Sequence, residues 1–530
     1  MHSEKNVFIL TQERAVEIIS KIKVDFFVID EFYKLSPTNA DEERCHILNQ
    51  VFYTLVKKGA QFYLLGPNIE QVTTNLLENV KYKFIRTDYK TVVSERHRIK
   101  VDNDENAIER LIKLASSLTK PTLIFCQSPA SANKVANAFL ANDKFSKIQG
   151  NENLSIWLKE NYHSKWILPH CIEKGIGIHH GRIPRSIAQK CVKLFNDEKI
   201  KYLICTSTLI EGVNTKAKNV IIFDNKIAKD KFDYFTFNNI CGRSGRMFSH
   251  FIGNIYLFHE PPPAKLPLVD FPIFSQNDNV PEKLLINLAD EDLKDNSKEK
   301  LQKYNEQNIV SKEVLKQNSY IDLDRQIALA SAIQKNIPRI NTFLQWNQYP
   351  NNEQLKTVCL LIWKFFVEPQ KMVYNISSGK QLHFKINQFR AAKSIKNFIA
   401  DNIRNNNSDE DINKDIESSF EILRYWINYQ FPRYLMSLGS IANHIFEKNN
   451  LKKCDYSYFA SLVECYFLKP YVVPLDEYGL PIQVSEKIGE EFQVSDNIDE
   501  ALTQLKKFIP TSNTFSEIEK EFIKEFQQYI

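Results

Sequence analysis

Short apolar runs of four or five residues recur through the first half of this 530-residue chain and limit the folds open to it. They are Val7–Leu10, Phe26–Ile29, Phe62–Leu65, Thr122–Cys126, Tyr202–Cys205 and Val220–Phe223. Continuous apolar runs of this length are typical of strands buried on both faces, as in a parallel sheet under helices. A helical pattern, Pro184–Asn196, precedes one of the runs, which is the expected alternation. Residues 1 to about 260 are therefore predicted to be α/β.

Changes in composition divide the chain into three predicted regions. Charged residues with few large aliphatic side chains indicate a connector over Arg86–Glu105. A proline-rich stretch at 261–272 ends regular structure. We therefore predict domains at 1–95, 105–262 and 285–530.

The third region is predicted to be mainly α-helical. Helical patterns occupy Ile321–Phe343, Leu355–Val367 and Phe389–Ile403. A polar stretch at Ala289–Asn308 is expected to be exposed, and a second at Asn405–Asp415 is expected to be a loop. This half of the sequence contains no motif that indicates a chemistry.

Charge, cysteine content and hydropathy narrow the class of protein. The net charge of +5 is small for this length and permits only a local basic groove. The nine cysteines form no CxxC pair, so neither a zinc site nor a disulfide framework is indicated. A reducing, cytoplasmic compartment is expected. The sequence shows no secretory signal and no apolar stretch near the ~20 residues that span a bilayer, so no membrane partner is predicted.

Two carboxylates, Asp30 and Glu31, directly follow the apolar run Phe26–Ile29. Ligands of α/β proteins bind at the carboxyl ends of strands, so these carboxylates are expected to face a crevice. Nucleotide hydrolysis requires one carboxylate to hold Mg²⁺ and another group to orient the attacking water. Considered alone, such a pair after a strand is more often a solvated turn.

Two arginines, Arg243 and Arg246, stand three residues apart among the glycines of the segment 237–246. On one helical face, two guanidinium groups at this spacing converge on phosphate charge. The glycines permit close approach of the backbone. For either arginine alone, a basic turn is the simpler interpretation.

Three further segments lie between these two, in a fixed order: Thr122–Ser128, Gly177–Arg182 and Cys205–Asn214. Together the five segments resemble motifs II, IV, V and VI of superfamily 2 helicases, most closely the DExH group with Ski-like proteins. Leu10–Arg14 resembles the nucleic-acid-contacting motif Ib that precedes motif II. The resemblance covers about residues 6–260 and implies an ATP-dependent enzyme that moves on single-stranded DNA or RNA.

The resemblance also implies a role for individual residues. Asp30 is expected to ligate Mg²⁺ and Glu31 to activate water, while Arg243 and Arg246 act as arginine fingers on the γ-phosphate of ATP. The residues implied near the nucleotide are Gly212, Asn214, Asn239 and Gly242, and those implied at the nucleic-acid backbone are Thr11, Gln127, Ser128, Gly181, Thr206 and Thr208. Hydroxyl and glycine positions suit backbone binding because they reach phosphate oxygens without reading bases.

The resemblance also implies an identity for each predicted domain. Residues 1–95 are expected to be a truncated first RecA-like domain, and 105–262 the second, helicase C-terminal domain. The resemblance implies a winged helix plus a helical bundle within 285–530. The His179–His180 pair has no third metal ligand at a useful spacing. The resemblance instead places His180 and Gly181 in a loop at the nucleic-acid face.

The sequence departs from the family pattern in the first domain. Tyr33 stands where the fourth motif II residue is usually His or Asp, which puts the coupling of ATP state to nucleic acid in doubt. The Ser-Ala-Thr of motif III is replaced by a segment, 64–68, with no such sequence, and Asn239 replaces the motif VI glutamine. A phosphate-binding loop of the Walker A kind, rich in glycine with a lysine and a hydroxyl, does not precede Asp30. The near match Ser378–Lys380 follows motif VI and lacks the upstream glycine.

Two function hypotheses follow. In the first, the chain is part of an ATP-dependent helicase and is inactive alone until a missing N-terminal segment, from the same gene or a separate chain, supplies the phosphate loop. In the second, it is a degenerate helicase that serves as a nucleic-acid-binding or scaffold module. The retained Asp30, Glu31, Arg243 and Arg246 favour the first hypothesis, because a module without catalysis does not need them.

Overall fold

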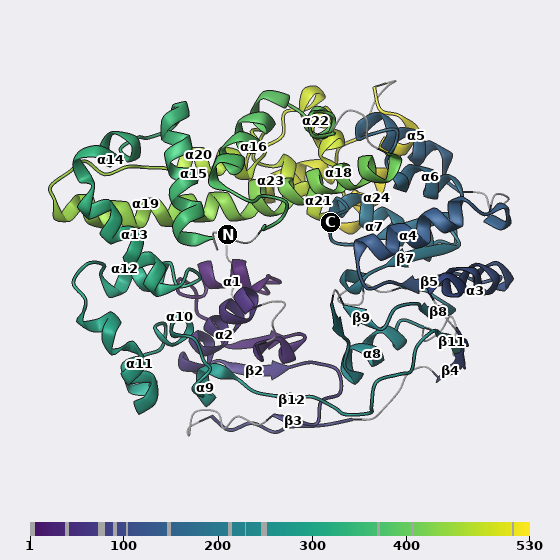
Figure 1. The fold of residues 1–530 in the computed structure, drawn as a ribbon, viewed down its shortest axis with the longest axis horizontal. Coiled ribbons are helices and arrows are strands. Elements are labelled where there is room, and N and C mark those ends of the chain that lie inside the picture. Colours follow the sequence, from purple (N-terminus) through teal and green to yellow (C-terminus); the bar gives the residue numbers. More distant parts are fainter. Residues whose placement is uncertain are drawn as a thin grey trace. The chain divides into compact units, whose positions relative to one another are not determined.

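The computed structural model describes residues 6–37, 42–72, 80–87, 93–101, 104–145, 150–209, 215–227, 229–244, 252–367, 372–403, 408–510 and 514–530 (Figure 1). The chain forms two compact units. The first comprises Met1–Asp88, Leu266–Pro369 and Tyr434–Tyr456. The second comprises Tyr89–Lys265, Gln370–Arg433 and Ser457–Ile530. The helical region that follows residue 285 is therefore shared between the two units.

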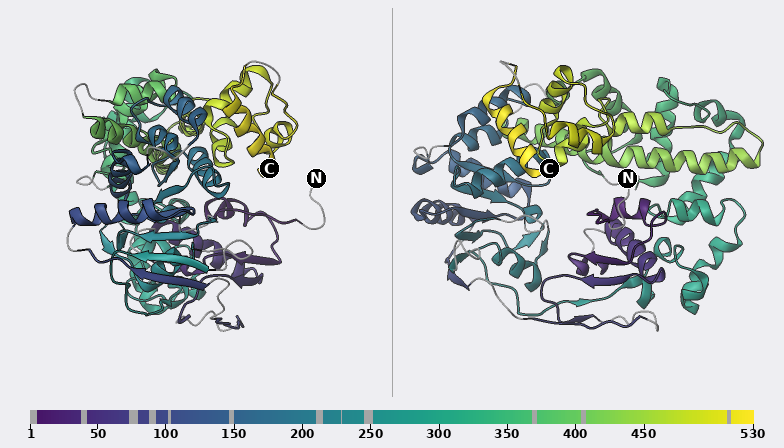
Figure 2. Two further views of the ribbon diagram at one scale, coloured as in Figure 1. Left: turned by 90° about the vertical axis from the view of Figure 1, so that its right-hand side faces the viewer. Right: turned by 180° about the vertical axis from the view of Figure 1, so that it is seen from behind.

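The first unit contains a parallel pair of strands, β1 (Phe26–Ile29) and β2 (Gln61–Leu64), with Phe26 opposite Gln61 and Ile29 opposite Leu64. Helix α2 (Glu42–Lys57) covers one face, where Phe52 contacts the rings of Phe27 and Phe62. In Figure 2, α2 and the strand pair are drawn in purple. Helix α1 (Gln12–Ile18) packs on α2.

The other face of this strand pair, called the bare face below, is not covered by the residues that the structure describes. Phe26, Val28 and Tyr63 are 55%, 50% and 57% exposed, and all three point away from α2. We predicted that both faces of these strands would be buried, and for this pair the prediction is wrong. A strand buried on both faces needs a covering layer on each side, and the described residues provide only one.

The predicted strand at Val7–Leu10 is also wrong. These residues are irregular in structure, and Ile9 is 94% exposed. A strand requires a hydrogen-bonded neighbour, and none of the described strands pairs with this segment. An apolar run without a partner strand does not become a strand.

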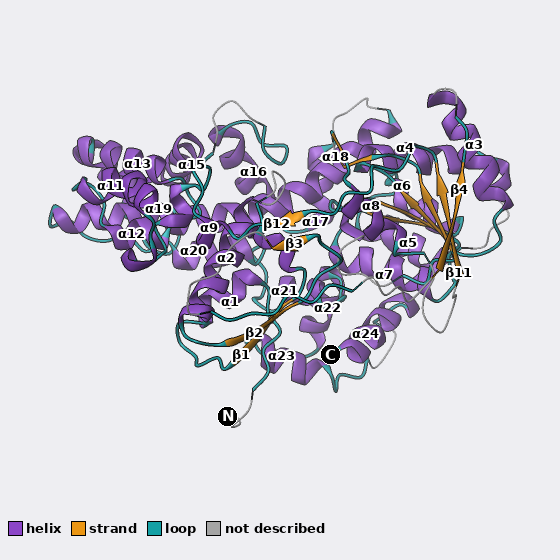
Figure 3. Ribbon diagram, turned by 90° about the horizontal axis from the view of Figure 1, so that it is seen from below, coloured by secondary structure: helices purple, strands orange, loops and turns teal. Residues whose placement is uncertain are grey.

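The second unit contains a parallel sheet of six strands in the order β4–β11–β8–β5–β7–β6, which Figure 3 shows as an orange fan. The strands are β4 (Val93–Arg98), β5 (Thr122–Phe125), β6 (Ile176–His179), β7 (Tyr202–Cys205), β8 (Asn219–Ile222) and β11 (Ile252–Leu257). Every residue of β5, β7 and β8 is buried, as their continuous apolar sequences predict. Strand β4 lies inside the stretch predicted to be a connector; its charged, largely exposed residues mark it as an edge strand, which hid it from the sequence pattern.

Helices cover this sheet and fill its core. They are α3 (Asp104–Ser117), α4 (Pro129–Leu140), α5 (Glu152–Asn161), α6 (Ile167–Glu173), α7 (Arg185–Asn196) and α8 (Tyr234–Cys241). The predicted helix at 184–196 is confirmed as α7, which contacts β6 and β7. Phe139 and Phe145 pack against Tyr202, whose hydroxyl donates to the Ala115 carbonyl at 2.7 Å. The buried polar tip of Tyr202 thereby fixes α3 to the sheet.

The first unit also contains helices beyond residue 266. They are α9 (Pro272–Ser275), α10 (Glu282–Leu285), α11 (Asp295–Glu306), α12 (Lys312–Gln317), α13 (Leu323–Lys335), α14 (Ile337–Leu344) and α15 (Asn352–Phe366), with most of α19 (Phe431–Lys448). Helix α9 and the Asp292 carboxylate contact α2. The Asp292 carboxylate accepts from the Tyr53 hydroxyl at 2.6 Å and from the Lys57 ammonium at 2.7 Å. Helix α11 shows that the polar stretch 289–308 is not simply exposed, because Leu301 and Tyr304 are buried.

The second unit also contains a layer of helices. It consists of α16 (Gly379–Ala392), α17 (Ile395–Asn402), α18 (Asp409–Glu421), the π-helix η5 (Ile422–Gln430), α20 (Ser457–Glu464), α21 (Val472–Glu477), α22 (Ile482–Glu491), α23 (Ile498–Leu505) and α24 (Glu517–Tyr529). The loop predicted over 405–415 is wrong from residue 409 onward. Ser408 accepts a hydrogen bond from the Asp411 backbone and starts α18 there.

Short elements complete the structure. They are the strand pairs β3 (Gln71–Val72) with β12 (Leu268–Val269) and β9 (Lys226–Ile227) with β10 (Asp230–Lys231), and the 3-10 turns η1 (Phe32–Leu35), η2 (Asp143–Phe145), η3 (Ser207–Leu209) and η4 (Asp290–Asp292). Within the described ranges, no helix has the length and hydropathy needed to cross a membrane.

Candidate nucleic-acid interface and nucleotide site

Five residues predicted to contact nucleic acid lie along one edge of the six-stranded sheet. Strands β5 and β6 both pair with β7, so that Phe125 and His179 each stand opposite Cys205. The strands are parallel, and the residues that follow them therefore emerge at the same edge. These residues are Gln127 and Ser128 after β5, Gly181 after β6, and Thr206 and Thr208 after β7.

The segment after β5 is fixed by a carboxylate that the sequence did not reveal. Asp224, just beyond β8, accepts from the Gln127 backbone N–H at 2.9 Å and from the Ser131 hydroxyl at 2.5 Å. The Ser128 hydroxyl accepts from the Ser131 backbone N–H at 3.2 Å and caps α4. The side chain of Gln127 is left at the edge, while Ser128 has a structural role in addition to the predicted one.

The segment after β7 presents one buried and one exposed hydroxyl. Thr206 is buried, and its backbone N–H donates to the His179 carbonyl at 3.1 Å. The exposed Thr208 hydroxyl lies 3.3 Å from the hydroxyl of Thr206 and 3.3 Å from Nδ1 of His179. Burial and the neighbouring His180 lower the pKa of His179 to about 4, so this ring is neutral at pH 7. Thr208 is therefore the hydroxyl of this pair that is accessible from outside.

The loop after β6 is held by α18. Glu417, which is 2% exposed, lies 3.4 Å from Nε2 of His180 and 3.9 Å from Nη1 of Arg182. It also accepts from the Asn133 amide at 2.8 Å, and Glu421 lies 3.6 Å from Nε of Arg182. Burial raises the pKa of Glu417, but the charges and hydrogen bonds of these neighbours outweigh burial and lower it. The carboxylate is therefore charged at neutral pH.

His180 lies in the loop after β6, but its ring is not at the surface. It is buried against Glu417 instead. The described residues contain no cluster of three or more His, Cys, Asp or Glu that could hold an ion. Sequence gave no signal for this pairing, since the two residues are far apart in the chain and Glu417 lies in a polar stretch.

Gly181 is clamped by the π-helix. Its carbonyl accepts from Nη1 of Arg424 at 2.8 Å, across 243 residues of sequence. A Cβ on this glycine would lie 3.5 Å from Thr208 and 3.7 Å from the Tyr425 hydroxyl. A side chain at this position would make ordinary van der Waals contacts, so the hydrogen bond from Arg424 joins the loop to η5 and the absence of a Cβ does not. π-helical segments of this kind are frequent at functional sites.

In the first unit, the two carboxylates stand where the sequence predicts, after β1. The Asp30 carboxylate accepts from the Glu31 backbone N–H at 3.0 Å, and Glu31 pairs with the Lys34 ammonium at 2.8 Å. Glu31 has φ of 58°, a left-handed conformation that is uncommon outside glycine and clusters at functional sites. The sharp turn leaves Asp30 exposed at the strand end.

The segment 64–68, which replaces motif III, lies beside this turn. The Phe32 backbone N–H donates to the Leu65 carbonyl at 3.0 Å. A Cβ on Gly66 would lie only 2.9 Å from the Phe32 ring, so this position requires glycine. Thr11, predicted to contact nucleic acid, precedes α1 in the same unit; its side chain is exposed and makes no capping hydrogen bond.

Of the two predicted arginines, the structure describes Arg243. Helix α8 ends at Cys241 with Gly242 as its cap, so Arg243 lies beyond the helix. Asn239 lies in the last turn of α8 and is partly exposed. The charge of Arg243 opposes burial in setting the pKa of Cys205, which places this arginine near the end of β7. Gly212, Asn214 and Arg246 lie outside the described residues.

Comparisons with known proteins agree with this geometry. Residues 105–248 match the family model described as "Helicase conserved C-terminal domain". The chain is 29% identical over 521 residues to "Anti-bacteriophage protein B" of Escherichia coli, which covers 94% of this chain and 70% of that protein. It is 24% identical over 280 residues to "Helicase POLQ-like" of Caenorhabditis elegans, covering 46% of this chain and 30% of that one. It is 33% identical over 85 residues to "Hachiman protein HamB" of Bacillus cereus, covering 16% and 8%.

The matched residues contain β5, β6, β7 and β8, together with the edge that carries Gln127, Ser128, Gly181, Thr206 and Thr208. The parallel sheet and the helical region that follows it also confirm the predicted fold class. Residues 105–248 are therefore a RecA-like helicase C-terminal domain, and the chain carries the C-terminal portion of a superfamily 2 helicase.

Proposed function

We propose that this chain is part of an ATP-dependent helicase or translocase that moves on single-stranded DNA or RNA in the cytoplasm. The alignment of Gln127, Gly181 and Thr208 at one edge of the β5–β7–β6 sheet carries the proposal. Backbone and hydroxyl groups at such an edge bind phosphates without reading bases. A motor that steps along a strand needs this tolerance of sequence.

ATP with Mg²⁺ would bind between the two RecA-like domains. In this proposal Asp30 ligates Mg²⁺, Glu31 orients the attacking water, and Arg243 and Arg246 stabilise the charge on the γ-phosphate. Gly212, Asn214, Asn239 and Gly242 contact the nucleotide. The strand-end position of Asp30 and Glu31 supports the assignment, since the carboxyl ends of parallel strands are where α/β proteins bind ligands.

We further propose that an additional segment completes the first domain. The bare face of β1 and β2 presents Phe26, Val28 and Tyr63, and a two-stranded parallel sheet is marginal on its own. Exposed apolar patches of this kind mark interaction sites. The segment, from the same polypeptide or a partner, would supply covering helices, further strands and the phosphate-binding loop, and this chain would not hydrolyse ATP without it.

A degenerate scaffold role is the second candidate function. The departure at Tyr33 and the replaced motif III segment favour it, because both lie where ATP state is coupled to nucleic acid in the family. Turnover by the completed protein decides between the two. A scaffold would bind a strand and remain inactive even with the completing segment present.

The named relatives suggest a biological setting. The E. coli relative, which matches 94% of this chain, carries the name "Anti-bacteriophage protein B". We propose that this protein likewise acts against bacteriophages. Phage plating on a host expressing the complete protein and on a host expressing its Glu31→Gln variant tests this. Protection that is lost in the variant supports the proposal, and equal plaque numbers on host, wild type and variant contradict it.

Strand binding is tested at Thr208. Valine matches threonine in shape but removes the hydroxyl, so Thr208→Val is expected to weaken binding of labelled single-stranded DNA or RNA by about 3–10-fold, as for the loss of one hydrogen bond. Fluorescence anisotropy measures the change. The matched control is Thr503→Val, an exposed threonine on α23 of the same unit. Equal affinities of the two variants would remove the sheet edge from the binding site.

A further inference from the structure

A charged side chain from η5 occupies the carbonyl of Gly181, in the loop between β6 and α7. Nη1 of Arg424 donates to this oxygen at 2.8 Å. Because the donor is a guanidinium, the hydrogen bond is charge-assisted and stronger than one between neutral groups. A carbonyl oxygen carries partial negative charge and repels a phosphate. A loop that binds the backbone of a strand therefore gains when this acceptor is already engaged.

The backbone N–H of Gly181 is left available in the same loop. The next two backbone N–H groups are engaged locally, since Arg182 donates to Nδ1 of His180 at 3.3 Å and Ile183 donates to the His180 carbonyl at 3.1 Å. Gly181 is partly exposed, and its N–H donates to no acceptor among the residues that the structure describes. Backbone N–H groups in such loops are suited to bind phosphate oxygens.

Asp476 of α21 fixes the other end of the loop. Its carboxylate accepts from the Ser186 hydroxyl and, at 3.4 Å, from the Ser186 backbone N–H, in the first turn of α7. Burial raises the pKa of Asp476, while the hydrogen bonds from Ser186 and the charges of Arg185 and Arg424 oppose the rise. Arg424 therefore stabilises the carboxylate at the start of α7 as well as holding the carbonyl of Gly181.

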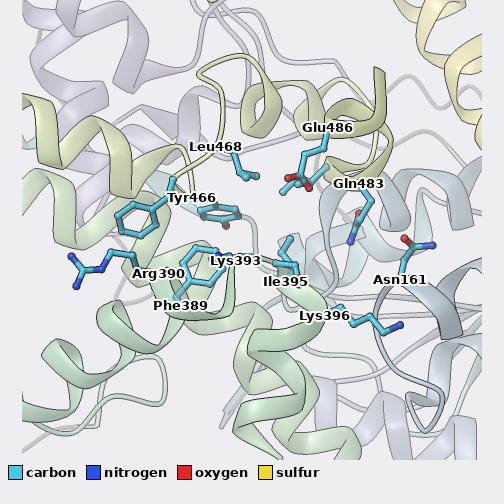
Figure 4. Close-up of a pocket in the computed structure, with 13 residues that line it drawn as sticks. Asn161, Phe389, Arg390, Lys393, Ile395, Lys396, Tyr466, Leu468, Gln483 and Glu486 are labelled. Carbon is cyan, nitrogen blue, oxygen red and sulfur yellow. The ribbon is translucent and has the colours of Figure 1, made fainter. Parts of the chain in front are cut away.

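Further groups of the second unit surround the guanidinium of Arg424. Its Cζ lies 5.7 Å from the centre of the Tyr425 ring. Burial raises the pKa of Tyr466, a residue that lines the pocket drawn in Figure 4, and the charge of Arg424 opposes the rise. Burial lowers the pKa of His179, and the charge of Arg424 adds to that effect. Arg424 is thus held among these groups, next to the loop that it contacts.

We propose that Arg424 is a positioning residue for strand binding: it holds the Gly181 carbonyl and leaves the Gly181 N–H to donate to a phosphate of the strand. Arg424 itself does not contact the strand in this arrangement. The inference rests on the strand-binding function proposed above, and it names the residue that prepares the loop after β6 for that function.

Fluorescence anisotropy of the full chain with labelled single-stranded DNA and RNA tests the proposal. Methionine keeps the apolar stem of arginine but removes the donor and the charge, so Arg424→Met is expected to weaken binding about tenfold. Lysine keeps a charged donor for a single hydrogen bond, so Arg424→Lys is expected to weaken binding less than about threefold. The control is Arg110→Ala, which removes one charge from an exposed position on α3 and should leave the affinity unchanged.

The salt dependence of binding separates positioning from direct contact. Each cationic side chain that neutralises a phosphate of a single strand adds about 0.7 to the slope of log affinity against log salt concentration. A backbone N–H carries no net charge, so Arg424→Met should keep the slope of the wild type. A slope that is smaller by about 0.7 would show that Arg424 binds a phosphate itself and would overturn its positioning role.

Amide hydrogen exchange of the free protein separates an effect on the loop from an effect on the fold. Exchange in Arg424→Met should be faster at residues 180–183 and unchanged in β5 and β7, and exchange that quickens throughout the second unit, or nowhere, overturns the positioning role. Should Arg424→Met not fold, Arg424→Gln takes its place with the same expected loss of binding. Wild-type binding that Arg424→Met leaves unchanged, or an equal loss in Arg424→Met and Arg424→Lys, overturns this inference alone. No strand binding by the wild type would overturn the proposed function as well.

Discussion

The two parallel sheets of this chain differ in how completely they are covered. Strands β5, β7 and β8 of the second unit are buried along their whole length, while β1 and β2 of the first unit are covered by α2 on one face and bare on the other. Their sequences are equally apolar: Phe26–Ile29 and Tyr202–Cys205 contain no charged residue. An apolar sequence therefore predicts that a strand is buried. The structure is needed to show whether the described residues bury it.

In the covered sheet, side chains from other elements also hold the segments that follow the strand ends. Glu417 and Arg424 hold the loop after β6, and Asp224 holds the segment after β5. In the first unit, Glu31 pairs with Lys34 three residues along the chain, and the Phe32 backbone N–H donates to the Leu65 carbonyl. This contrast predicts large effects of substitution in the second unit and small ones on the bare face of the first.

The largest effect is expected for Glu417→Ala. The substitution leaves His180 and Arg182 without their buried partner, and breaking a buried ion pair from one side costs about 3–5 kcal/mol. Denaturant unfolding, with hydrogen exchange in β5–β8 as the readout, measures the loss of stability. Glu410→Ala, an exposed position on the same helix, is the control and should change little. A similar effect of both variants would show that Glu417 does not brace the loop.

The lowered pKa of Glu417 also predicts how the free energy of unfolding changes with pH. The pKa of Glu417 is lowered in the folded state, so its contribution to stability is present above the ordinary glutamate pKa of about 4.3 and is lost as the pH falls through the lower folded value. The wild type should therefore lose stability to acid more steeply than Glu417→Ala. Parallel curves of unfolding free energy against pH between about 5 and 2 would contradict the charged state of this carboxylate.

The next effect compares the two sheets directly. Leu203 in β7 is fully buried, and Leu203→Ala is expected to cost about 2–5 kcal/mol. Val28 in β1 is half exposed, and Val28→Ala should cost under about 1 kcal/mol. Hydrogen exchange of each strand in the two variants reports the losses separately. Comparable losses at the two positions would mean that the bare face is covered in solution.

A smaller effect is expected at the start of α4. Ser128→Ala removes the cap that accepts from the Ser131 backbone N–H and should cost about 1 kcal/mol. Ser116→Ala near the end of α3 is the control, since its hydroxyl only bonds back to a helix carbonyl. Thermal unfolding of the two variants decides. A cost at Ser116 equal to that at Ser128 would argue against the capping role.

The smallest effect on stability is expected for Phe26→Ser on the bare face. The side chain gives up little buried area in the isolated chain, but we expect the variant to bind the completing segment at least tenfold more weakly. Pull-down with a RecA-like half-domain measures binding, and Lys23→Ser, at an exposed position just before β1, is the control. Undiminished binding by Phe26→Ser would exclude this face as the docking surface.

Sequence predicted the sheet better than the site. Apolar runs identified β1, β2, β5, β7 and β8 because each is short, continuous and unbroken by charge. The run Val7–Leu10 failed because hydrophobicity does not supply a neighbouring strand, and β4 was missed because an edge strand can be charged. The partners Asp224, Glu417 and Arg424 could not be predicted, since their contacts depend on which distant segments the fold brings together.

The positions of the motif residues were easier to predict from sequence than the residues that hold them in place. Asp30 and Glu31 directly follow β1, as their position after an apolar run predicts, and Gln127, Gly181 and Thr208 follow β5, β6 and β7. Arg243 departs from the predicted helical face, since Gly242 ends α8 before it. Local geometry was therefore predictable where a strand ends, and less so where a helix must be terminated.

We propose above that a segment docking on the bare face of β1 and β2 completes the ATP site. ATP hydrolysis by the chain alone, with and without single-stranded DNA and RNA, tests it most directly, with Glu31→Gln as the blank. We expect a rate of ATP hydrolysis equal to that of the blank under every condition. Turnover that nucleic acid stimulates and Glu31→Gln abolishes would contradict it, because other residues of this chain would then hold the phosphates.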